Sequence, residues 1–244
     1  MASSDLQNAH GERIDCSFHP GLKREVLVIL GHGVTGNKDR PLLVALANGL
    51  AAKNWPCLRI SYTGNGHSGG RFEDSCISKG IEDLQAVIGS VPDDVAVVYV
   101  GHSMGGAVGV LTAARDLRVR VLVTLAGMVH TADFVKREFG DVIPGQGVMW
   151  EDPSCPLSQA YVDDLTSIGN TLEAAETVRQ PWLLIHGLED DVIPSQDSRE
   201  AFEAANCVKK LVEVPGADHV FDEATYGQVI EEVAGWLERH FPGI

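Results

Sequence analysis

The stretch VAVVYVGHSMGG, residues 95–106, joins an apolar run to a segment of small side chains. The apolar part predicts a buried strand, and residues 107–115 predict the helix that follows it. Ser103 stands between them, two residues after one glycine and two residues before another. Only glycine fits those flanking positions in so tight a turn, and the N-terminus of the following helix directs backbone N–H groups at whatever the serine attacks. The stretch therefore predicts a nucleophilic serine on a strand-to-helix turn.

Apolar runs of similar length recur along the chain and alternate with amphipathic stretches. Further strands are expected at residues 26–30, 57–62, 119–125, 182–185 and 211–214, with an antiparallel edge strand at 14–18. Helices are expected at residues 42–50, 81–88, 195–205 and 229–237. Near-continuous apolar strands alternating with helices predict an α/β fold, in which a mostly parallel central sheet is flanked by helices on both faces. The length of 244 residues predicts a single domain, residues 1–244.

Residues 128–177 interrupt this alternation. The strand before this segment ends near Ala126 and the next begins at Trp182, whereas a plain crossover needs far fewer residues. Prolines and glycines divide the segment, and we interpret Trp150 as its one large aromatic platform. The segment is interpreted as an inserted cap over the site, with Trp150 as a candidate substrate-binding residue. An extended surface crossover without functional weight is the alternative.

The composition is that of an ordinary folded protein with an acidic surface. The formal net charge is −15, the isoelectric point is about 4.9 and the mean hydropathy is +0.01. Nucleic acid and anionic membranes require a basic footprint, so neither is expected as a partner. No apolar run approaches the ~20 residues of a membrane span, and residues 1–12 show no signal peptide, so a soluble cytoplasmic protein is expected. The five cysteines form no C-x-x-C pair and are expected to be free thiols.

A serine hydroxyl needs an adjacent base, which a carboxylate in turn orients. In a parallel sheet both groups belong to loops at the carboxyl ends of strands, with the acid before the histidine in the chain. Asp190 follows the strand at 182–185 and His219 follows the strand at 211–214, so we assign Asp190 as the acid and His219 as the base. Three other carboxylates compete for the acid role, of which Asp191 is the runner-up: Glu189, Asp191 and Asp218.

Two backbone N–H groups are expected to form an oxyanion hole. One belongs to Met104, directly after the nucleophile, and the other to Val34 in the glycine-rich loop at residues 31–36. A phosphate-binding loop is discounted because no G-K-[ST] follows and no acidic residue ends the next strand. The histidines beside the glycines of these loops are interpreted as structural or supporting: His32, His102 and His186. Because no cluster of ligand side chains is visible, neither a metal nor a cofactor is expected.

These blocks resemble the α/β-hydrolase superfamily of serine esterases and lipases. The resemblance is carried by residues 32–38, 64–73 and 216–219 together with Ser103 and the Asp190 loop. Residues 64–73 are similar to the cinnamoyl and feruloyl esterase and serine aminopeptidase-like branch, which implies cleavage of hydroxycinnamate and simple acyl esters under a small cap. Residues 131–176 do not match that branch, so the resemblance does not transfer its substrate to this chain.

The leading interpretation is a serine carboxylic-ester hydrolase that acts through an acyl-enzyme on small to medium acyl or aryl esters, with a small-molecule ester as its only expected partner. An acyl thioesterase, an amidase or aminopeptidase, and a non-catalytic small-molecule binder are the alternatives. A coenzyme A thioester would call for a basic rim. Residues 130–176 instead contain nine acidic side chains and two basic ones, Lys136 and Arg137. A binder is disfavoured because every catalytic position is filled. The oligomeric state is left open.

Overall fold

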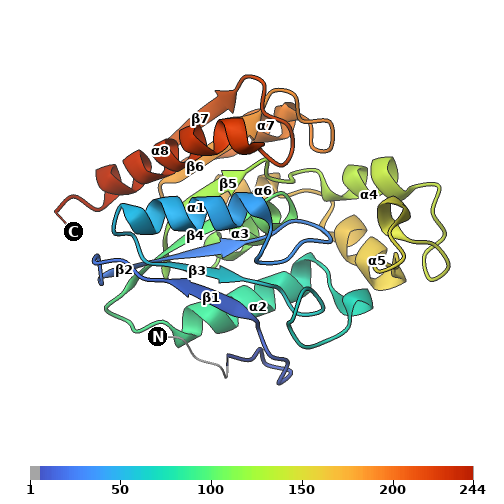
Figure 1. Ribbon diagram of the computed structural model, residues 1–244. Coiled ribbons are helices and arrows are strands. Elements are labelled where there is room, and N and C mark those ends of the chain that lie inside the picture. Colours follow the sequence, from blue (N-terminus) through green and yellow to red (C-terminus); the bar gives the residue numbers. More distant parts are fainter. Residues whose placement is uncertain (1–5, 244) are drawn as a thin grey trace.

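The central feature of the computed structural model, which describes residues 6–243, is a sheet in the spatial order β1-β3-β2-β4-β5-β6-β7 (Figure 1). β1 runs antiparallel to β3, and every other pair is parallel. The strands are β1 (Cys16–His19), β2 (Val26–Gly31), β3 (Cys57–Ile60), β4 (Ala96–His102), β5 (Val119–Leu125), β6 (Trp182–Gly187) and β7 (Lys209–Val214). The expected strands are all present, and the edge strand begins two residues later than predicted.

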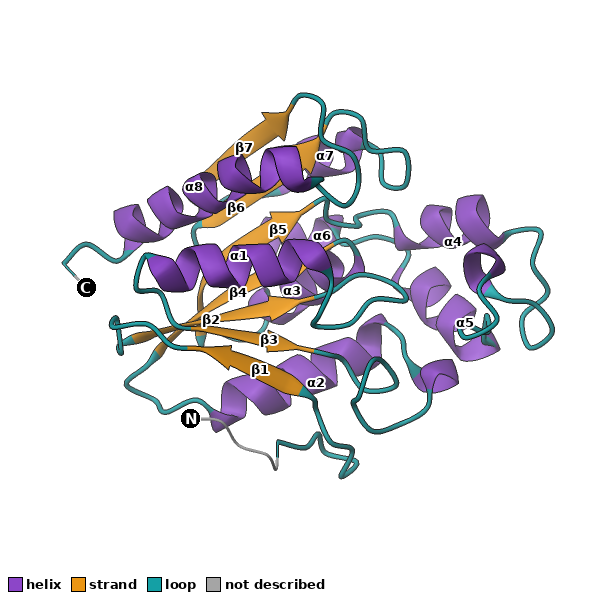
Figure 2. Ribbon diagram, viewed as in Figure 1, coloured by secondary structure: helices purple, strands orange, loops and turns teal. Residues whose placement is uncertain are grey.

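Helices cover both faces of the sheet, as Figure 2 shows. They are α1 (Pro41–Ala52), α2 (Ile77–Ser90), α3 (Met104–Ala113), α4 (Thr131–Phe139), α5 (Gln159–Ile168), α6 (Leu172–Thr177), α7 (Ser195–Ala204) and α8 (Glu223–His240). Alternate residues of one strand serve the two faces: Val28 packs in the cluster with α1 and α8, whereas Leu27 packs in the cluster with α2 and α3. Both neighbours are buried, which explains why the strands are apolar without alternation.

The segment between β5 and β6 holds α4, the 3₁₀ helix η2 (Met149–Glu151), α5 and α6. α4 and α5 lie beyond the carboxyl ends of the central strands (Figure 1). The entry to the segment is fixed from α7, because the buried Asp197 carboxylate accepts hydrogen bonds from the N–H groups of Val129 and His130 at 2.9 and 3.2 Å. The loops of this segment thus come close to the strand ends where catalytic groups are expected.

Trp150 is one of several aromatic side chains in this segment. Phe134, Phe139 and Tyr161 are buried within it. The Trp150 ring packs edge-on against Phe139 with 5.0 Å between ring centroids. Trp150 differs from the other three in being 44% exposed. Apolar periodicity in a segment broken by prolines did not reveal that the phenylalanines form a small core of their own.

Two further features of the described chain are the hydrophobicity of its helices and the state of its cysteines. None of the helices within residues 6–243 combines the length and the hydrophobicity needed to cross a bilayer. All five cysteines are free, and burial raises the pKa of each thiol above its ordinary value. For Cys57 and Cys76 burial raises the pKa to about 12.

Candidate active site

Ser103 occupies a strained turn between β4 and α3. Its backbone has φ 54° and ψ −117°, a conformation that residues with a side chain rarely adopt. The turn leaves no space beside it, because a Cβ atom on Gly101 would lie 2.1 Å from the carbonyl oxygen of Gly105. The serine carbonyl accepts hydrogen bonds from the N–H groups of Gly106 and Met128 at 2.8 and 3.0 Å. These contacts hold the serine at the carboxyl end of β4, where it is 3% exposed.

Asp190 and His219 lie together, from two different loops. His219 Nδ1 donates to Asp190 Oδ2 at 2.8 Å. The other oxygen, Oδ1, accepts the N–H groups of Val192 and Ile193 at 2.9 and 2.8 Å. Burial opposes ionisation of Asp190, but the hydrogen bonds from His186 and His219 outweigh it and hold the pKa of the carboxyl well below its ordinary value. The side chain is therefore an ionised acceptor that orients the imidazole of His219.

The other three carboxylates form no hydrogen bond or ion pair with His219 within residues 6–243. The Asp218 carboxylate instead accepts the N–H of Val220 at 3.0 Å, in its own turn. Asp191 is exposed, at the surface of the loop. The structure thus brings His219 to the assigned acid and not to its sequence neighbours.

His186 is more closely involved than the sequence suggested. Its Nε2 lies 3.1 Å from Asp190 Oδ2 and 3.0 Å from the carbonyl oxygen of Ile193, and both partners are acceptors. The hydrogen therefore resides on Nε2, and Nδ1 is left to accept the hydroxyl of Ser198 at 2.7 Å. A buried histidine thus donates to the same carboxylate oxygen as His219 and helps to fix the acid. The sequence signal that could have revealed this contact is the position of His186, four residues before Asp190.

Two other histidines support the loops around Ser103. His102 Nε2 donates to the backbone carbonyl of His219 at 2.8 Å. Burial, with a smaller contribution from the charge of His219, lowers the pKa of His102 to about 3. His32 Nε2 accepts the Tyr62 N–H at 3.0 Å, so Nδ1 carries the hydrogen and donates to the Gly33 carbonyl at 2.8 Å. Both rings are neutral and support the neighbouring loops through hydrogen bonds, in agreement with the interpretation of these histidines as structural or supporting.

The loop at residues 31–36 lies directly against Ser103. A Cβ atom on Gly33 would lie 2.8 Å from Ser103 Cβ, so only glycine permits this approach. Within the described part of the chain, neither the Val34 N–H nor the Met104 N–H donates to a protein acceptor. Two backbone donors beside the serine are therefore free to bind a ligand oxygen.

A cavity of about 500 Å³ connects these groups. Ser103, His219 and Val34 line it together with Trp150. Trp150 and its neighbour Glu151 both have positive φ, 47° and 60°, and the indole Nε1 donates to Glu138 Oε2 at 3.1 Å. No hydrogen bond joins the Ser103 hydroxyl to His219 in residues 6–243; catalytic hydrogen bonds of this kind often tighten only in the complex with substrate.

Several wall residues of this cavity were not predicted from the sequence. They are Arg40, Pro41, Leu42, Leu43, Val192, Val220 and Tyr226. They come from the start of α1, from loops beside Asp190 and His219, and from the first turn of α8, which periodicity cannot bring together. Within the described part of the chain, the titratable side chains of these walls are the histidines, Arg40 and the phenol of Tyr226.

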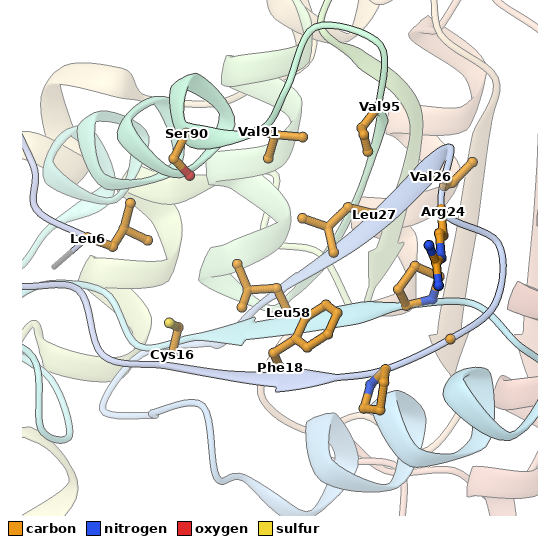
Figure 3. Close-up of a pocket in the computed structure, with 13 residues that line it drawn as sticks. Leu6, Cys16, Phe18, Arg24, Val26, Leu27, Leu58, Ser90, Val91 and Val95 are labelled. Carbon is orange, nitrogen blue, oxygen red and sulfur yellow. The ribbon is translucent and has the colours of Figure 1, made fainter. Parts of the chain in front are cut away.

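A second cavity, of about 720 Å³, lies at the amino ends of the strands (Figure 3). Leu27 and Leu58 project into its centre, and Phe18 forms one side. Its titratable groups are the thiol of Cys16 and the guanidinium of Arg24, with no histidine or carboxylate among the lining residues. It is larger than the Ser103 cavity but lacks a nucleophile paired with a base. Within residues 6–243, no three His, Cys, Asp or Glu side chains are grouped so as to hold a metal ion.

Comparison with known proteins agrees with this architecture. A family model described as the alpha/beta hydrolase family matches residues 26–232. The uncharacterized protein YfhR of Salmonella typhimurium is 24% identical over 232 residues, which cover 90% of this chain and 73% of that protein. The mitochondrial palmitoyl-protein thioesterase ABHD10 of Homo sapiens is 27% identical over 157 residues, which cover 59% of this chain and 50% of that protein. The solved structure described as ferulic acid bound to Est1E from Butyrivibrio proteoclasticus has a TM-score of 0.85 at 23% identity, covering 96% of this chain and 97% of that one.

Proposed function

This chain belongs to the alpha/beta hydrolase family, and from that premise we propose that it is a carboxylic-ester hydrolase whose nucleophile is Ser103. The resemblance drawn from the sequence motifs is confirmed by the family match and by the shared fold. The observation that carries the proposal is that Ser103 and His219 line one cavity and that the His219 imidazole is hydrogen-bonded to the buried carboxylate of Asp190. A strained serine, a histidine and its buried carboxylate partner come from the loops after β4, β7 and β6.

In the first half of the reaction, His219 Nε2 takes the proton of the Ser103 hydroxyl as the oxygen attacks the ester carbonyl. The Nδ1 hydrogen bond to Asp190 fixes the tautomer that leaves Nε2 free to accept. The negative charge that develops on the carbonyl oxygen is stabilised by the N–H groups of Val34 and Met104. Protonated His219 then gives its proton to the leaving alcohol, and an acyl-enzyme remains.

In the second half, water attacks the acyl-enzyme and His219 acts again as the base. The tetrahedral intermediate collapses, the carboxylic acid leaves and Ser103 recovers its proton. His102 supports both halves because it holds the backbone of His219 through the 2.8 Å bond to the carbonyl. Its low pKa, about 3, keeps a second positive charge away from the imidazolium of His219.

The proposed substrates are small to medium acyl or aryl esters. The cavity of about 500 Å³ has mostly apolar walls, which suit an aliphatic or aromatic group. We propose residues 128–177 as the cap over this cavity and Trp150 as the wall that contacts an aryl group. The similarity to a structure that holds ferulic acid supports aryl esters as the first class to test.

A thioesterase with the same three groups is the second candidate. It is favoured by the similarity to a palmitoyl-protein thioesterase. Thioesters and oxygen esters pass through the same acyl-enzyme, so the geometry of Ser103 and His219 serves both. The leaving group and the length of the acyl chain would distinguish them.

The deciding experiment is hydrolysis of p-nitrophenyl esters from acetate to laurate, with methyl ferulate and an acyl thioester alongside, by wild type and Ser103→Ala. We expect wild-type turnover, and a loss of about a thousandfold or more in the variant. Circular dichroism controls for folding. A fluorophosphonate should label wild type quickly and the variant not at all. Turnover retained in Ser103→Ala would refute the mechanism, and a folded wild type that neither turns over nor labels would point to a non-catalytic binder.

A further inference from the structure

Among residues 6–243, Arg40 is the only Asp, Glu, Lys or Arg side chain that lines the Ser103 cavity. The chain as a whole carries 34 acidic and 19 basic residues, so a lone cation at this place is unlike the surface around it. The residue precedes α1 and is exposed at the cavity wall. A positive charge on the wall of the proposed substrate cavity attracts the anionic groups of any ligand that enters the cavity.

The guanidinium of Arg40 is held in place but has no acidic partner. One nitrogen, Nη2, donates to the carbonyl of Thr35 at 3.1 Å, on the loop that also bears Val34. Within residues 6–243, no carboxylate lies within 4.0 Å of it. The neighbouring Asp39 is already paired, with Lys38 Nζ and Arg59 Nη1 at 2.9 Å each. Four of the five N–H donors of Arg40 are therefore available to a ligand.

The field of Arg40 reaches both the cavity wall and the proposed cap. The low pKa of His102 is due mainly to burial, and the charge of Arg40 adds to it. Asp152, on the proposed cap, has a pKa lowered mainly by hydrogen bonds from Ser154, again with a contribution from Arg40. The charge of Arg40 thus acts both on a residue beside Ser103 and on a residue of the proposed cap. The first turn of α1 carries no acidic side chain that would cancel its charge.

We infer that Arg40 is an anion subsite, and that the preferred substrates are esters that carry one carboxylate apart from the scissile bond, such as half-esters of dicarboxylic acids. This inference rests on the proposed ester hydrolysis. A planar guanidinium binds a carboxylate through two parallel hydrogen bonds. The single positive charge of Arg40 balances the single negative charge of such a carboxylate. A polyanion such as a nucleotide-bearing thioester would instead be repelled by the acidic segment at 130–176.

The test compares monomethyl esters of succinate, glutarate, adipate and suberate with the corresponding dimethyl esters. The measured quantity is the ratio of kcat/KM for each half-ester to that for its neutral diester, which removes effects common to both. We expect a ratio above one at the chain length that spans Ser103 and Arg40. Arg40→Gln should lower this ratio about fivefold, a size set by a partly solvated ion pair. Arg40→Lys keeps the positive charge and should therefore retain most of the preference for the half-ester.

Arg24→Gln is the matched control, because it removes the same charge from the other end of the strands (Figure 3). It should leave the ratio unchanged. An unchanged ratio in Arg40→Gln would refute the subsite, and so would a wild type that hydrolyses diesters readily with no preference for half-esters. In both cases the proposed esterase function would stand.

Failure of the esterase proposal itself would look different, because neither kind of ester would then be hydrolysed. Calorimetric titration of monomethyl adipate into Ser103→Ala and into Ser103→Ala with Arg40→Gln separates the two ideas. We expect about fivefold weaker binding without Arg40. Equal binding to both proteins would refute the subsite whatever the reaction is.

Discussion

Four hydrogen-bond donors converge on the carboxylate of Asp190, two from backbone N–H groups and two from imidazole rings. An amide in its place would have to point its NH₂ group at a donor, which disturbs His219 most because its correct tautomer depends on this contact. Asp191, the next residue, is exposed and makes no such contact.

We therefore expect Asp190→Asn to lower kcat by about a hundredfold or more, and Asp191→Asn to change it less than twofold. Steady-state kinetics on one p-nitrophenyl ester measures both. Asp191→Asn is the matched control, because the same charge is removed one residue away. The reverse order of effects would assign Asp191 as the acid.

The low pKa of Asp190 predicts how stability depends on pH. Burial opposes its ionisation, and the bonds from His186 and His219 more than compensate, so the folded pKa lies below the unfolded value of about 4. The ionised group thus stabilises the fold above that pH, and the contribution is lost as the pH falls from about 4 toward the folded pKa. The free energy of unfolding in urea should therefore fall more steeply between about pH 5 and pH 3 for wild type than for Asp190→Asn. Parallel curves would contradict this account.

At the scale of elements, the site depends on loops that follow parallel strands. The sequence predicted Ser103, Asp190 and His219 because each stands in the loop that follows an apolar run, and strand polarity places such loops at one edge of the sheet. His186 was not recognised as a partner of the acid, because His32 has the same local pattern of a histidine before a glycine in a strand-end loop. Arg40 was missed because its position depends on how residues 35–40 fold back toward the cavity.

Residues 149–151 give the proposed cap its contact with the cavity. Trp150 has positive φ and is supported by Phe139 and Glu138, so the indole is placed by its neighbours rather than by its own backbone preference. We expect Trp150→Ala to lower kcat/KM for methyl ferulate about tenfold more than for p-nitrophenyl acetate, because only the larger aryl group reaches the indole. Equal losses on both esters would show that Trp150 supports the fold of the segment instead of contacting substrate.

At the scale of the whole molecule, the sheet and its covering helices could be predicted, and the interior of residues 128–177 could not. Strands such as 26–31 are apolar throughout because both faces are covered, a pattern that needs no tertiary knowledge. α5 had a local signal that was not used: Ser158 accepts the N–H of Tyr161 at 3.0 Å, as an N-cap does. The order of the strands is set by crossovers, which leave no periodic trace in the sequence.

The raised pKa of every thiol leads to a prediction for the intact protein. None of the five cysteines lines the Ser103 cavity, and burial disfavours the reactive thiolate in each. Incubation with iodoacetamide near pH 7.5 should therefore leave ester hydrolysis unaffected, while a fluorophosphonate abolishes it. Residual activity and intact mass measure the two effects. Rapid inactivation that tracks the alkylation of one cysteine would show that a thiol controls the site.

The segment between β5 and β6 enters and leaves the sheet at neighbouring strands, and it contains Trp150 but none of the residues proposed to transfer protons. The four donors to the Asp190 carboxylate, from His186, Val192, Ile193 and His219, all lie outside this segment. Descendants of one ancestral gene could acquire new esters by altering this single stretch, while the reaction itself is inherited unchanged.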